Sequence, residues 1–326
     1  MVAGDLIPWL LDSDPALRWQ VERDLLHEPP AVWVATRAKV ASVGFGAQLL
    51  ALQDADGQWA GGAFFPKDFD PDGPDAAGGG QPWTATTWSL NFLREWGVDA
   101  DILRERRTVE LLSENSRWEY DDLPYWGGEV DCCINAWTVQ NGLWLGADIS
   151  GIVDWLVEHQ LPDGGWNCEW VEGSTRSSVH STINSLKGLL AHEIATGGTE
   201  GTRTARKSGE EYLLQRELFR RLSTGEPIAA WVDHVAFPFF WFYSVLNAAD
   251  YFREVSQFDA TPPNPRMSDA IALIRAARQP DGTWRQGRRV PGRMWFEIDV
   301  PEGEPSKWLT LCGTRVLEWW DGESER

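Results

Sequence analysis

The sequence predicts an all-α protein assembled from repeated pairs of helices. Two observations carry this prediction: a short motif recurs three times, and apolar residues recur at helical spacing without comparable β alternation. The motif reads Q-x-x-D-G-x-W at Gln53–Trp59 and at Gln160–Trp166, and it is one residue shorter at Gln279–Trp284. Each copy follows an apolar helical stretch and precedes a loop that leads to another helix. Such self-similarity is typical of arrays whose units cannot bury their apolar faces alone.

The chain opens with a helix signal, because Asp14 followed by Pro15 fits an N-cap and a first helical residue. Residues 5–26 are therefore expected to form a helix pair that closes one end of the array. They belong to an N-terminal helical extension over residues 1–46.

Five further helix pairs are expected. Their ranges are 47–97, 105–147, 152–196, 207–254 and 268–320. Ser150 and Ser268 stand where they can cap helices in the third and fifth pairs. No composition shift marks a boundary, so residues 1–326 are expected to form a single domain.

The repeated motif is interpreted as structural. Asp and Gly supply a turn after the first helix of a pair, the Trp packs back on the helix end, and the Gln can bond free backbone groups there. The motif thus staples neighbouring helices and carries no chemistry of its own.

Composition excludes several kinds of partner. The 326 residues include 49 acidic and 29 basic side chains, for a formal net charge of −20. Nucleic acid needs a basic surface, so it is not an expected partner, and an anionic membrane surface is disfavoured for the same reason. The 21 Trp residues exceed what a surface could carry and indicate packing between helices or the lining of an apolar cavity.

The four cysteines are too few for a disulfide framework in a chain of this length, which favours a reducing compartment. Residues 1–11 lack the features of a signal peptide, and the longest apolar run, around 235–246, is too short to span a bilayer. A cytoplasmic location without a transmembrane segment is therefore expected. The oligomeric state stays open.

The three motifs resemble the QW motifs of terpenoid cyclases of the squalene–hopene type and of protein prenyltransferase β subunits. The resemblance covers most of the chain from about residue 47 onward. It implies an α/α toroid of five to six helix pairs, with inner and outer rings of helices around a central cavity.

A second likeness concerns a metal site. Asp131 and Cys133 begin one expected inner helix, and His180, 47 residues beyond Cys133, begins the next. A carboxylate, a thiolate and an imidazole suit Zn²⁺, although a cysteine near a helix start is more often a buried apolar residue. Protein prenyltransferase β subunits carry V-D-G-C-Y-S-F-W and then Y-H-T, which 130–137 and 179–181 partly match. The resemblance therefore implies Asp131, Cys133 and His180 as zinc ligands.

The departures from both relatives limit the expected reaction. Prenyltransferases place cations shortly before the Asp to hold a diphosphate, whereas residues 125–129 contain none. Squalene–hopene cyclases use a D-x-D-D motif as proton donor, and this chain has no such motif. An apolar or thiol-containing small substrate that is not a diphosphate is therefore expected.

Other residues complete the predicted site. Glu129 could act as general base on a zinc-bound water, with a solvated loop carboxylate as the plainer alternative. Arg176 could clamp an anionic substrate group, and His234, placed at the start of the next inner helix, could face the cavity; both are also unremarkable as surface residues. Cys168, on the turn after Trp166, is a further candidate metal contact.

Aromatic residues at expected inner-helix positions could line the cavity, with plain helix packing as the alternative. They include Trp83, Trp126, Trp137, Phe237, Trp241 and Trp308.

The sequence thus favours a zinc-dependent enzyme of the terpenoid cyclase/prenyltransferase kind. Two alternatives remain: a metal-free cyclase or isomerase that uses an Asp or Glu as proton donor, and a non-catalytic toroidal binding protein.

Overall fold

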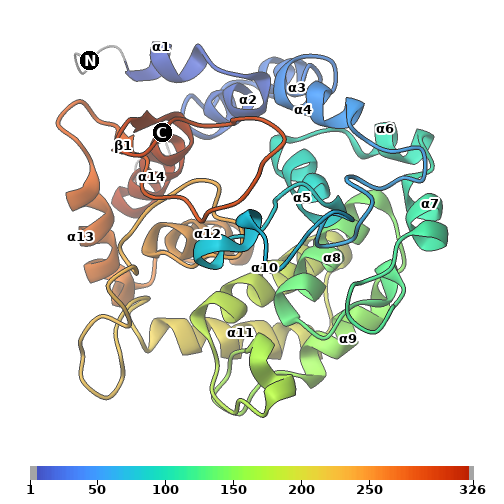
Figure 1. Cartoon of the computed structure of the whole chain (residues 1–326). Helices are drawn as coiled ribbons and strands as arrows, with labels where there is room; N and C mark the ends of the chain where they lie inside the picture. Colours follow the sequence, from blue (N-terminus) through green and yellow to red (C-terminus); the bar gives the residue numbers. More distant parts are fainter. Residues whose placement is uncertain (1–5, 323–326) are drawn as a thin grey trace.

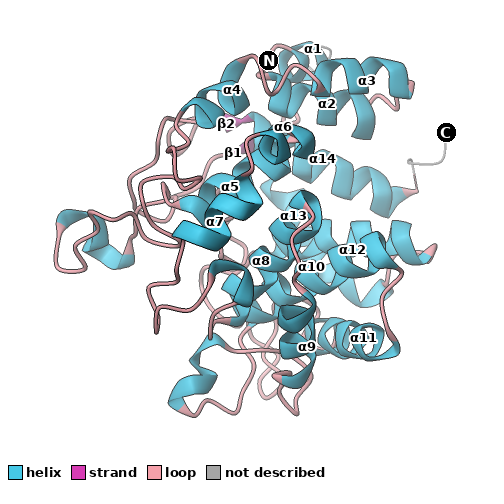
Figure 2. Cartoon of the chain, turned by 90° about the vertical axis from the view of Figure 1, so that its right-hand side faces the viewer, coloured by secondary structure: helices cyan, strands magenta, loops and turns pink. Residues whose placement is uncertain are grey.

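A computed structural model describes residues 6–322 of the chain, and these residues are mostly helical (Figures 1 and 2). The helices are α1 (Leu6–Leu11), α2 (Pro15–Asp24), α3 (Pro30–Arg37), α4 (Gly44–Ala51), α5 (Thr86–Trp96), α6 (Ala100–Glu105), α7 (Thr108–Asn115), α8 (Cys132–Leu145), α9 (Ser150–Glu158), α10 (Val179–Thr196), α11 (Glu200–Leu214), α12 (Val245–Asp259), α13 (Ser268–Ala277) and α14 (Lys307–Asp321). Two short strands, β1 (Trp284–Arg285) and β2 (Pro305–Ser306), pair antiparallel. The all-α prediction is confirmed at this level.

The helix pairs follow the repeats. Each motif lies between the two helices of a pair, in the order α4–α5, α9–α10 and α13–α14, and the pairs α7–α8 and α11–α12 lie between them along the chain. The fourth pair departs most from its expected range of 207–254, because residues 215–244 form a long irregular segment between its helices. None of the helices within residues 6–322 combines the length and apolarity that a bilayer span requires.

The predicted helix caps are confirmed in part. Asp14 accepts a hydrogen bond from the Ala16 backbone N–H at 2.9 Å, as expected for the cap of α2. Ser150 is instead the first residue of α9, and Ser268 follows a 3₁₀ turn whose cap is Asn264. Each serine is therefore the first residue of its helix, α9 or α13, and the N-cap is the residue before it. Of the expected N-terminal extension, residues 1–5 lie outside the described residues.

The tryptophan of each motif ties the turn to the end of the first helix of its pair. Its indole N–H donates to a backbone carbonyl ten residues earlier, near the helix C-terminus, where carbonyls lack helical partners. The donors are Trp59, Trp166 and Trp284, and the acceptors are Leu49, Leu156 and Ile274, at 2.9, 2.7 and 3.1 Å. All three indoles are fully buried, so water cannot bond their N–H groups, and the helix carbonyls serve as their acceptors.

The same tryptophans tie the turn to the second helix. Each Trp backbone N–H donates to the hydroxyl of a buried threonine near the start of that helix. The acceptors are Thr86, Thr182 and Thr310, at 3.1, 3.1 and 3.0 Å. The structural interpretation of the motif is therefore confirmed, with a threonine partner that the sequence analysis did not identify.

The second helices of the pairs are neighbours in chain order, since α5 packs on α8, α8 on α10, α10 on α12 and α12 on α14. Helix α2 packs on α14, and its Trp19 indole donates to the Trp96 carbonyl at the end of α5 (2.8 Å). Figure 1 shows the blue N-terminal helices beside the red α14. One buried apolar cluster extends from Leu10 to Trp319.

Replacing Thr182 by Val tests the bond between the turn and the second helix. The change keeps the side-chain shape but leaves the buried Trp166 N–H without its acceptor, so the free energy of unfolding should fall by about 1–3 kcal/mol. Urea unfolding of Thr182→Val measures this, with the exposed Thr175→Val as matched control. Equal stabilities of the two variants would contradict a stabilising role for the bond between the Trp166 N–H and Thr182.

Asp299 provides a second, pH-dependent test of the packing. Its Oδ2 accepts hydrogen bonds from Ser306 Oγ (2.6 Å) and Gln286 Nε2 (3.0 Å). Burial nevertheless raises the pKa of this carboxyl from 3.8 to about 6. The folded state therefore favours the protonated form.

The sign of the effect on stability follows from that direction. Between about pH 4 and about pH 6 the unfolded chain ionises Asp299 first, so rising pH costs stability. Asp299→Asn should match the parent near pH 4 and exceed it by about 1–3 kcal/mol at neutral pH. Denaturant unfolding across this pH range checks the expectation, and a difference independent of pH would contradict it.

Candidate metal centre and cavity

The start of α8 is held by a tightly bonded turn. The Asn135 side chain accepts from the Glu129 backbone N–H (2.7 Å) and donates to the Glu129 carbonyl (2.6 Å). Glu129 Oε2 in turn accepts from the Asp131 backbone N–H at 2.5 Å. Gly128, at φ 87°, allows the chain to turn here, and Cys132 and Cys133 follow in the first turn of α8.

Three cysteines meet at this point. Cys168 begins a 3₁₀ turn after Trp166, and its Sγ lies 3.4 Å from Cys132 Sγ and 3.3 Å from Cys133 Sγ. Ser181 of α10 holds Cys168 in place, because its hydroxyl accepts from the Cys168 backbone N–H at 3.1 Å. We call Cys132, Cys133 and Cys168 the thiol cluster.

The cluster favours one negative charge. Hydrogen bonds from the two helical thiols hold the pKa of Cys168 well below its usual range. Burial raises the pKa of Cys132, and bonding to the neighbouring thiols raises the pKa of Cys133. A thiolate on Cys168 is therefore stabilised by hydrogen bonds from the two neighbouring thiols.

Two carboxyls and an imidazole flank the cluster. Burial, reinforced by the negative charge on Cys168, raises the pKa of Asp131 to about 8 and also raises that of Glu129. Burial lowers the pKa of His180 to about 4, so this imidazole is neutral. Four aromatic rings surround it, those of Trp231, Trp241, Phe242 and Tyr243.

The thiol cluster fits a soft metal ion. Among residues 6–322, its three sulfur atoms form the one group of three or more His, Cys, Asp or Glu ligand atoms within 4.8 Å of one another. Three thiolates are ligands that Zn²⁺ accepts, and they leave a fourth position open. The chemistry of the donors therefore agrees with the expected zinc.

The ligand set differs from the one expected, since Cys133 belongs to the cluster but Asp131 and His180 do not. His180 Nδ1 accepts the Tyr243 backbone N–H at 2.9 Å, which places the imidazole proton on Nε2. The ring would have to give up this bond to ligate through Nε2. Asp131 and His180 as ligands stay predictions.

A cavity of about 890 Å³ lies among the second helices and α2. Near the N-terminal ends of these helices its lining is aromatic, with Trp88 of α5, Trp137 of α8 and Trp308 of α14. The irregular segment 215–244 adds three phenylalanines, at positions 237, 239 and 240.

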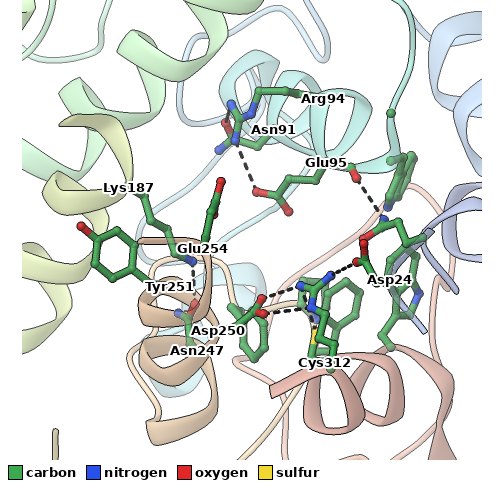
Figure 3. Close-up of a pocket in the computed structure, with 18 of the residues that line it drawn as sticks. Asp24, Asn91, Arg94, Glu95, Lys187, Asn247, Asp250, Tyr251, Glu254 and Cys312 are labelled. Carbon is green, nitrogen blue, oxygen red and sulfur yellow. Dashed lines mark hydrogen bonds and ion pairs between the residues drawn. The ribbon is translucent and has the colours of Figure 1, made fainter. Parts of the chain in front are cut away.

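Charged residues dominate the other end of the cavity. Figure 3 shows Asp24, Glu95, Asp250 and Glu254, from three helices, around the same space. Most of the cations there are neutralised within the protein. Arg315 pairs with Asp24 and Asp250, Arg253 pairs with Asp250, and Arg94 pairs with Glu95.

Asn184 of α10 connects the cavity with the thiol cluster. Its side chain lines the cavity, and its Nδ2 lies 3.6 Å from Cys133 Sγ and 3.1 Å from the Trp241 carbonyl oxygen. Trp137, one helical turn after Cys133, lines the cavity on the same side. The sulfur atoms thus adjoin the aromatic end without lining it.

The expected cavity aromatics divide into two groups. Trp137, Phe237 and Trp308 line the cavity. The remaining three pack elsewhere. Trp83 stacks on Phe240, Trp126 donates to the Val109 carbonyl, and Trp241 packs on His180.

The expected catalytic residues are not brought together. Glu129 adjoins the thiol cluster through Asp131. Arg176 is exposed, in the loop before α10. His234 does not start an inner helix as expected, because α12 begins only at Val245; it is exposed and bonds the Arg288 carbonyl at 2.9 Å. The expectation failed because the fourth pair lacks a recognisable motif to set its register.

Sequence reasoning also missed residues. Cys132 was not singled out, although its position beside Cys133 at a helix start is the signal that could have found it. Lys187 and Asn184 lie three residues apart on the cavity face of α10, and no motif marks them.

In comparisons with known proteins, no family model, no curated protein and no solved structure matches this chain.

Proposed function

We propose that this protein is an α/α toroid of the terpenoid cyclase and prenyltransferase kind, and that it is an enzyme acting on an apolar substrate. The succession of packed second helices from α5 to α14 supports the toroid, and α2 supplies the remaining contact between α14 and α5. The first helices would then form the outer ring. The resemblance of the QW motifs points to the same arrangement.

The metal of this proposed enzyme would be zinc, held by Cys132, Cys133 and Cys168. Asp131 interacts with Cys168 and is therefore placed to supply a fourth ligand, whereas His180 keeps its bond to the Tyr243 N–H. When bound, zinc would supply Lewis acidity and would lower the pKa of a bound water or thiol. Glu129, beside Asp131, would take up or release the proton.

The substrate class follows from the cavity. Its aromatic end would hold an apolar chain, such as an isoprenoid, through apolar contact and the π faces of the rings. A diphosphate is disfavoured, because the cavity arginines 94, 253 and 315 already pair with carboxylates of the protein.

One observation carries the proposal: Asn184 contacts both the cavity and the thiol cluster. An apolar substrate in the aromatic end would therefore have its terminus next to a position where zinc chemistry is available. Displacement of the Asn184 side chain would open that path.

Metal analysis tests the proposed centre. Protein purified without added metal should contain about one zinc per chain, and Cys132→Ser, Cys133→Ser and Cys168→Ser should each lose most of it, because three ligands cannot be reduced to two without a large loss of affinity. Cys312→Ser is the matched control, since this buried cysteine lies outside the cluster.

His180→Ala separates the two ligand sets. Under the thiol set it should retain zinc, whereas under the set Asp131, Cys133 and His180 it should lose zinc while Cys132→Ser retains it. A parent protein without zinc would contradict the proposed centre and favour a metal-free cyclase or a binding protein.

Ligand binding tests the cavity. Farnesol should quench tryptophan fluorescence and bind more tightly than farnesyl diphosphate, because the cavity offers aromatic surface but few free cations. Phe239→Ala should weaken farnesol binding by about tenfold, from the loss of apolar contact.

Phe258→Ala is the control, because Phe258 is an exposed residue of α12 that does not line the cavity. Tighter binding of the diphosphate, or equal effects of the two substitutions, would contradict the proposed substrate class.

A further inference from the structure

Lys187 has no role in the proposed metal chemistry, yet it lines the cavity. It lies in α10, one turn beyond Asn184, and its side chain extends along the cavity wall towards α12 (Figure 3). Phe239 lies nearby, with its ring centroid 6.0 Å from the Lys187 nitrogen. The amine therefore faces the space that an apolar ligand would occupy.

The hydrogen-bond partner of this amine is neutral. Lys187 Nζ donates to Asn247 Oδ1 at 2.5 Å. The amide orientation is fixed, because Asn247 Nδ2 donates to the Phe242 carbonyl at 2.9 Å. An amide oxygen accepts from a neutral amine as well as from an ammonium group, so Lys187 retains a hydrogen-bond partner after it loses a proton.

No carboxylate oxygen within residues 6–322 lies within 4.0 Å of Lys187 Nζ. The groups whose negative charge attracts the Lys187 ammonium are Glu95 of α5, Asp250 and Glu254 of α12, and Cys312 of α14. Asp250 forms ion pairs with Arg315 and Arg253. Their combined attraction does not offset burial, which lowers the pKa of Lys187.

A half-buried lysine that lines a cavity and has no carboxylate partner has two stable outcomes: it binds an anion, or it loses its proton and becomes a nucleophile. The neutral Asn247 partner favours the second. We infer that Lys187 is a reactive amine that captures an apolar aldehyde or ketone in the cavity as an imine.

The reaction requires no oxidant or reductant. Neutral Lys187 Nζ attacks the carbonyl carbon, and the carbonyl oxygen takes up a proton to give a carbinolamine. The nitrogen then loses its second proton and the hydroxyl group leaves as water, so that a C=N bond replaces C=O. The aromatic end of the cavity would hold the apolar part of the ligand.

The inference extends the proposed function to a second kind of chemistry and does not depend on zinc. Its failure would leave the thiol centre untouched, and a zinc-free protein would leave the amine untouched. The two can therefore be tested separately on the full chain.

Reductive trapping with decanal tests the inference. The protein is incubated near neutral pH with decanal and sodium cyanoborohydride, and the modified lysine is identified by mass spectrometry of peptides. Lys187 should be modified at least about tenfold faster than the exposed Lys39, because burial lowers the pKa of Lys187 and leaves a larger fraction of its amine neutral. Lys39→Met should leave this labelling unchanged.

Two variants separate reactivity from mere burial. Lys187→Arg keeps the positive charge but should abolish cavity labelling. Asn247→Asp places a carboxylate at the amine and should slow labelling of Lys187 near neutral pH, with recovery at about pH 10. Circular dichroism and urea unfolding confirm that each variant is folded.

Three results would overturn the inference: modification of Lys187 no faster than of Lys39, equal labelling in Asn247→Asp, or unlabelled Lys187 in a protein that binds dodecanoate and loses this binding in Lys187→Met. The last result would identify Lys187 as an anion site instead.

Discussion

The structure depends on keeping polar backbone groups bonded at the buried junction between the two helices of a pair. A helix end leaves carbonyls without partners, and the following turn leaves N–H groups without partners. Trp59, Trp166 and Trp284 satisfy both, through an indole bond to the first helix and a backbone bond to the second. Because the junction is fixed from both sides, the motif tryptophan is attached within the first four residues of the second helix in each of these pairs.

The parallel arrangement of the second helices gives the cavity two different ends. Residues near the N-termini of the second helices gather on one side, and they include Trp88 and Trp308. Residues one to two turns later gather on the other side, and they include Glu95 and Arg315. Aromatic and charged residues that alternate along the sequence therefore lie at opposite ends of the cavity.

The most informative region is the one that departs from the repeat. The fourth pair has no copy of the motif, and at its junction the Tyr243 hydroxyl donates to the Leu218 carbonyl at 2.6 Å. The segment 215–244 is thereby free to extend over the aromatic end. It supplies Phe237 and Phe239 to the cavity and surrounds His180 with rings. A local violation of the repeat thus supplies much of the candidate site, as is often seen where function competes with regularity.

The sequence by itself determined the helical class, the order of most helix pairs and the structural role of the motif, because these depend on local periodicity and on turn residues such as Asp163 and Gly164. It also indicated Cys133 as a candidate zinc ligand. Only the tertiary structure decided that Cys132 and Cys168 join Cys133, since 35 residues and a change of direction separate Cys133 from Cys168. The same holds for Lys187 and Asn247, which lie 60 residues apart. Such partners are set by how helices pack, and packing leaves no short-range signal in the chain.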